Sequence, residues 1–83
     1  MHIDHMPTIL LLANMIKITI NPKDKHRFPH VHILHAEKSA LIDLEKFVVL
    51  ENNGFSEKTL KQVIAVLRDE QGFLLDAWRE YNG

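Results

Sequence analysis

The sequence predicts a small α+β domain, in which an antiparallel sheet of three to four strands is followed by a broken C-terminal helix or by two helices packed on one face. Apolar and polar residues alternate in the first half of the chain, which is the period of a strand. In the second half, apolar residues recur at helical spacing. A chain of 83 residues can bury one small core. We therefore assign residues 6–83 to a single domain and residues 1–5 to an N-terminal extension.

Three segments carry the strand pattern. Isoleucine alternates with other residues over Ile16–Ile20, and Asn21–Lys25 ends this strand, since proline lacks an N–H group and asparagine and aspartate favour turns. Phe28–His35 is the second strand and Ala40–Glu45 is the third. Phe47–Leu50 either extends the third strand or forms a short fourth one.

The connection between the second and third strands predicts how they pair. Ala36–Ser39 is a polar connection of four residues. A loop of this length places His32 opposite Asp43 and His30 opposite Glu45. We therefore expect two histidine–carboxylate pairs on the face of the sheet that the helices leave open.

The second half of the chain predicts the helices. Ser56 is a suitable N-cap, and the apolar stripe within Leu60–Leu67 predicts a helix that lies on the sheet. Gly72 interrupts the pattern, so we expect a kink or a second helix there. Beyond this break, Phe73 and Trp78 are predicted to lie in the core or at the contact between helix and sheet.

Composition and charge exclude several classes of protein. The net charge of −1 argues against a protein that coats nucleic acid in general. The absence of cysteine excludes disulfides and thiolate zinc sites, so packing must stabilise the fold, with self-association as a further contribution. Ile9–Leu12 is too short to span a membrane. We expect a cytoplasmic protein without a membrane partner and without a cofactor.

The candidate functional site is the segment His26–His35, which holds four of the six histidines. His30 and His32 project to the same side of the predicted strand. The first interpretation is metal-independent acid/base chemistry on RNA, because an imidazole can accept or donate a proton near neutral pH. In this interpretation His30 and His32 carry the protons, and Asp43 and Glu45 orient them.

The basic cluster directly before this strand has two interpretations. Lys25, His26 and Arg27 are the candidates for binding the phosphate of an RNA substrate. A solvated loop without a ligand is the alternative.

Two other interpretations of the histidine pair remain open. His30 and His32 could bind a metal ion, with Asp43 or Glu45 completing a set of nitrogen and oxygen ligands. Alternatively, the histidines only form hydrogen bonds to carboxylates across the strands or fill an interface with a partner. We expect no metal, and the choice between catalysis and a structural role stays open.

Four segments in a fixed order resemble a family of small bacterial proteins of unassigned function. Members of this family typically begin with MPTI and carry HNPPHFHV, ALIDIE and LLENWE in that order. Nearly the whole chain takes part in the resemblance, although Arg27-Phe28 stands where the family has Asn-Pro. The matching segments are Met6–Ile9, His26 with Pro29–His32, Ala40–Glu45 and Leu74–Trp78.

The resemblance implies a function in growth control. Members of the family resemble DhiT-like toxins of type II toxin–antitoxin pairs, and their genes commonly lie beside a gene for a second small protein. The chain would then be a growth inhibitor that acts on RNA or translation and is neutralised by a protein antitoxin encoded by the neighbouring gene. The family's PHxH histidines fall on His30 and His32, its preceding histidine on His26, and its acidic strand residue on Asp43. The alternative is a non-enzymatic protein-binding or regulatory module of such a pair.

Overall fold

The computed structural model describes residues 8–21 and 28–82. The N-terminal extension and the basic residues Lys25, His26 and Arg27 lie outside these ranges. The described elements are β1 (Thr8–Leu11), the short 3-10 helix η1 (Ala13–Met15), β2 (Lys17–Thr19), β3 (His30–His35), β4 (Lys38–Asp43), β5 (Val49–Asn53), α1 (Glu57–Asp69) and α2 (Gln71–Asn82).

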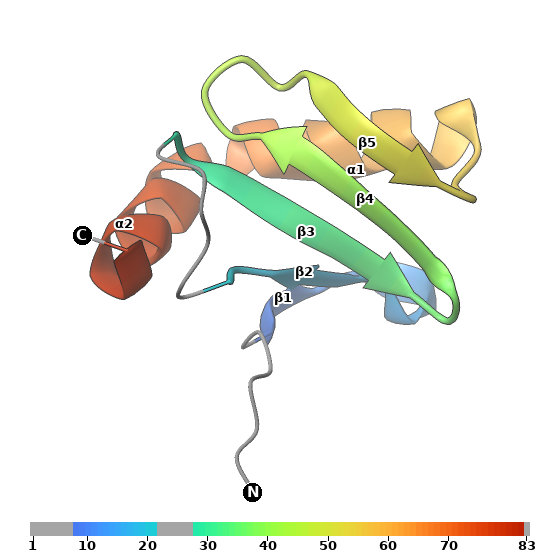
Figure 1. Ribbon diagram of the computed structural model, residues 1–83, viewed down its shortest axis with the longest axis horizontal. Helices are drawn as coiled ribbons and strands as arrows, with labels where there is room; N and C mark the ends of the chain where they lie inside the picture. Colours follow the sequence, from blue (N-terminus) through green and yellow to red (C-terminus); the bar gives the residue numbers. More distant parts are fainter. Residues whose placement is uncertain (1–7, 22–27, 83) are drawn as a thin grey trace, which may run out of the picture.

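The strands form one antiparallel sheet in the order β1-β2-β3-β4-β5, so the α+β prediction is confirmed. The sheet has five strands, one more than the upper predicted number. The additional strand is β1, which lies in an apolar run without alternation and therefore carries no strand signal of its own. Figure 1 shows α1 behind the sheet and α2 beside the end at which β3 begins.

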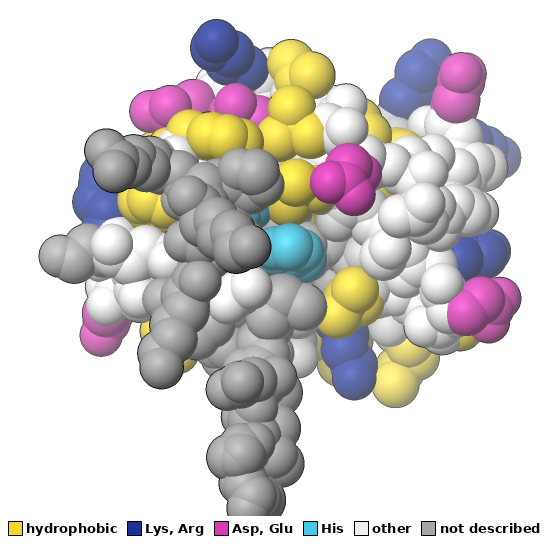
Figure 2. Space-filling view, in the orientation of Figure 1, with side chains coloured by type: hydrophobic (Ala, Val, Ile, Leu, Met, Phe, Trp, Pro, Cys, Tyr) yellow, Lys and Arg dark blue, Asp and Glu magenta, His cyan; other side chains and the backbone are white. Residues whose placement is uncertain are grey.

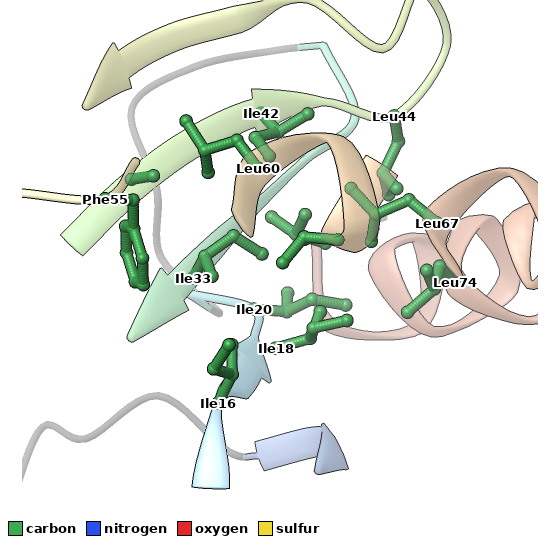
Figure 3. Close-up of a cluster of buried hydrophobic side chains, with 13 residues drawn as sticks. Ile16, Ile18, Ile20, Ile33, Ile42, Leu44, Phe55, Leu60, Leu67 and Leu74 are labelled. Carbon is green, nitrogen blue, oxygen red and sulfur yellow. The ribbon is translucent and has the colours of Figure 1, made fainter. Parts of the chain in front are cut away.

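The core lies between the sheet and the two helices. Ile18, Ile33 and Ile42 are fully buried and point from the sheet toward α1 (Figure 3). Leu67 of α1 and Leu74 of α2 close the core from the other side. The helical stripe predicted from the sequence is therefore the face that packs on the sheet.

The two ends of α1 are fixed by local interactions. Ser56 caps its start, because the Ser56 hydroxyl accepts a hydrogen bond from the Thr59 N–H at 3.1 Å, as predicted. The helix ends at Asp69, with Glu70 as its C-cap, before the predicted break at Gly72. The Gln71 amide donates a hydrogen bond to the Leu44 carbonyl at 2.9 Å, which ties the junction of the helices to the end of β4. Gly72 lies inside α2 and is not needed for the bend.

Candidate functional site

His30 and His32 lie on the face of β3 that is opposite to the core, as the alternation predicted. Val31, which lies between them, and Ile33, which follows His32, are fully buried on the core face. Figure 2 shows exposed histidine atoms in cyan on this face, with hydrophobic and acidic side chains nearby.

The predicted register of the hairpin is wrong by two residues. His30 pairs with Asp43 and His32 with Leu41, where the sequence predicted Glu45 and Asp43. The cause is a turn of only Ala36 and Glu37, because Lys38 already pairs with His35. Ala36 adopts a φ of 53°, which is unusual for a residue other than glycine. A register shift of two residues preserves the faces, which is why the core residues were predicted correctly.

His30 is buried and has a fixed ring orientation. Only 1% of its surface is exposed. Its Nδ1 lies 2.8 Å from the Phe28 carbonyl oxygen, and since a carbonyl can only accept, Nδ1 carries the hydrogen. In the neutral ring, Nε2 is then the basic nitrogen. The Phe28 ring lies 5.3 Å from the His30 ring, centroid to centroid.

Three rings join the sheet to α2 at this point. The His30 ring lies 5.5 Å from the His32 ring and 6.4 Å from the Trp78 ring, both in edge-to-face geometry. The predicted contact of Trp78 between helix and sheet is confirmed. Its buried indole Nε1 has no hydrogen-bond partner in the part of the chain that the structure describes. We refer to His30, His32 and Trp78 as the ring cluster.

Phe73 does not lie in the core, contrary to prediction, because 52% of its surface is exposed. The inward stripe of α2 contains Leu74 and Trp78, which are four residues apart, and Phe73 lies to one side of it. The contact of Trp78 with His30 has no local sequence signal, although the spacing of Leu74 and Trp78 indicates that both face inward.

Asp43 and Glu45 lie in a turn at the end of β4, in which only the Asp43 carboxylate takes part. Oδ1 of Asp43 accepts hydrogen bonds from the backbone N–H groups of Glu45 at 2.7 Å and Lys46 at 2.9 Å. Phe47, with a φ of 57°, donates its N–H to the Asp43 carbonyl at 2.9 Å and closes the turn. Glu45 is exposed and lies beyond the last residue pair of β3 and β4.

The structure therefore brings His30 and His32 together, but not in the predicted pairs with Asp43 and Glu45. Across residues 8–21 and 28–82, no group of three or more histidine, aspartate or glutamate side chains is placed to hold a metal ion. What the site can offer chemically is a half-buried imidazole, His32, in contact with a second imidazole whose orientation is fixed.

Comparison with known proteins identifies one similarity. Residues 15–79 match the family model described as Domain of unknown function (DUF4160). No curated protein and no solved structure matches the chain significantly. The matched range contains the ring cluster and all strands except β1. In the described part of the chain, neither helix has the length and apolar character needed to cross a bilayer.

Proposed function

The chain belongs to the family described as Domain of unknown function (DUF4160), and we propose that it is the toxin component of a type II toxin–antitoxin pair, neutralised by a protein antitoxin. The support is the resemblance of its ordered motifs to DhiT-like toxins. The family match spans three of these motifs, namely Pro29–His32, Ala40–Glu45 and Leu74–Trp78.

The observation that carries the proposal is the ring cluster, because it joins two of these motifs in space. His30 of Pro29–His32 meets Trp78 of Leu74–Trp78 although almost fifty residues separate them in the chain. A buried histidine with a fixed hydrogen bond, placed behind a half-buried one, is an arrangement that can orient a working imidazole.

We assign the proton-transfer role to His32, with His30 as the residue that positions it. His32 is the less buried of the two imidazoles. Asp43 is a turn-forming residue in this scheme, since its Oδ1 already accepts two backbone hydrogen bonds. The target is RNA or the translation machinery, and the chemistry is that of a metal-independent ribonuclease. Lys25, His26 and Arg27 keep their predicted role in phosphate binding.

The alternative is a non-enzymatic protein-binding or regulatory module of the same pair. It is favoured by one specific observation, which is that neither predicted carboxylate lies across the sheet from its predicted histidine. In this alternative the face around His32 is a docking surface for the partner.

Growth after tightly induced expression tests the proposal. Four untagged chains are compared: the wild type, His32→Ala, His35→Ala as the matched control, and the wild type together with its neighbouring gene. His35 lies on the same strand, outside the ring cluster, with only a 3.5 Å contact between its Nδ1 and the Met15 carbonyl oxygen. We expect growth arrest with the wild type and with His35→Ala, and growth with the other two.

Two outcomes contradict parts of this proposal. Normal growth with soluble wild-type protein rejects the toxin function. Arrest that persists in His32→Ala, combined with loss of binding to the purified neighbouring protein, assigns the face to partner binding and not to catalysis.

A further inference from the structure

The two edges of the sheet differ in how well they are protected against pairing with another strand. An edge strand presents backbone N–H and C=O groups on its outer side, and proteins usually protect such an edge with a short strand, a β-bulge, charged residues or proline. Here the edge strands are β1 and β5 (Figure 1). In the described chain, β1 pairs with β2 alone and β5 with β4 alone.

The β1 edge is short and irregular but has no protection by charge or proline within the strand. Thr8–Leu11 contains neither a charged residue nor a proline. Apolar surface continues beyond the strand, because Leu11 is 57% exposed and Met15 of η1 is 64% exposed. Large apolar side chains exposed at an unprotected edge are typical of a surface that pairs with another strand.

The β5 edge is less suited to pairing with itself. Glu51 is the central residue of Val49–Asn53 and is exposed. Antiparallel pairing of two copies of β5 about its centre would place the Glu51 side chains opposite each other, and like charges in that position are destabilising. Both β1 and β5 have an irregular register against their neighbours, so charge is the property that separates the two edges.

We propose that β1 pairs with β1 of a second copy of this chain, antiparallel and about a two-fold axis. The uncharged β1 strand meets its own copy without repulsion, and a two-fold interface uses the same patch on both copies. The two sheets then form one continuous sheet, and Leu11 of each copy loses exposed surface near the axis. This surface is distinct from the ring cluster, and the proposal does not depend on the toxin function.

The molar mass of the untagged chain as a function of concentration tests the proposal, measured by sedimentation equilibrium. Leu11→Lys places a charge at the β1 edge, and Leu50→Lys is the matched control on β5, where Leu50 is 42% exposed. We expect a dimer that dissociates on dilution. We further expect the Kd to rise at least about tenfold in Leu11→Lys and to change little in Leu50→Lys. Circular dichroism confirms that both variants are folded.

Amide hydrogen exchange of the wild type gives a second measurement that needs no variant. Protection of the Ile9 to Leu11 amides that increases with protein concentration supports pairing through β1. A monomer at all concentrations overturns the proposal, as does a dimer that Leu50→Lys weakens and Leu11→Lys does not. A monomer that needs Leu11 only to bind the neighbouring protein also overturns it, and assigns the β1 edge to a different partner.

Discussion

The two faces of β3 are buried by different means. On one face, Val31 and Ile33 pack among apolar side chains beneath the helices, where contacts have no required direction. On the other face, His30 is equally buried but is held by a directed hydrogen bond to the Phe28 carbonyl and by ring contacts to His32 and Trp78. Alternation along a strand therefore separates the chemistry of its two faces without showing which face is exposed.

The largest effect is expected on the apolar face. Ile33→Ala removes a fully buried side chain beneath the helices and should lower the free energy of unfolding by about 2–5 kcal/mol. The control Leu50→Ala, at a position where 42% of the surface is exposed, should change it by much less. Urea unfolding measures both variants. Equal losses in the two variants would contradict the position of the core.

A smaller effect is expected on the histidine face. His30→Leu removes the donor to the Phe28 carbonyl and should lower the free energy of unfolding by about 1–3 kcal/mol, although leucine is apolar and of similar size. The fluorescence of Trp78, the single tryptophan, should shift as well, because its ring contacts His30. Both readouts should change little in the control His35→Leu. A stabilised His30→Leu would show that the two faces are equivalent.

Two substitutions of Asp43 distinguish a structural role of this residue from a catalytic one. Asp43→Ala removes the acceptor of two backbone hydrogen bonds, and its loss should lower the free energy of unfolding by about 0.5–1.5 kcal/mol for each bond. Asp43→Asn keeps an oxygen at this position, so most of the stability should remain, and growth arrest should remain with it. Loss of arrest in a stable Asp43→Asn variant would return Asp43 to the catalytic set.

The proposed roles of the two histidines predict different effects on the rate of RNA cleavage. A substitution of His32 should slow cleavage more than a substitution of His30, which only positions His32. If His32 transfers the proton, His32→Ala should slow RNA cleavage by about 10²–10⁴-fold. The conservative variant His30→Gln should slow it less, and mainly through kcat. Equal losses in both variants, with unchanged folding, would show that the ring cluster acts as one unit.

The smallest effect is expected at Gly72, which belongs to neither face of β3. Gly72→Ala should raise the free energy of unfolding by about 0.5–1 kcal/mol, because the residue is helical and no atom lies within 4 Å of an added Cβ. Thermal unfolding measures the change. Destabilisation would show that the bend between α1 and α2 requires glycine after all.

Much of the fold could be predicted from local patterns. The alternation in Phe28–His35 determined the two faces of β3, and the helical spacing with the Ser56 cap determined α1, since these periods follow from backbone geometry over a few residues. The residues of the candidate site were less predictable. The pairing of the histidines depends on a turn in which Ala36 has a positive φ, and alanine gives no sequence signal for that conformation.

Local sequence patterns were enough to predict the periodicity, the single small core and the side of β3 on which the histidines lie. Three further features became visible only in the folded molecule: the fifth strand, the use of Asp43 in a turn, and the contact of His30 with Trp78. The difference comes from the range of the interactions. Strand and helix periods are set by neighbouring residues, whereas register and the docking of α2 depend on packing between segments that are far apart in the chain.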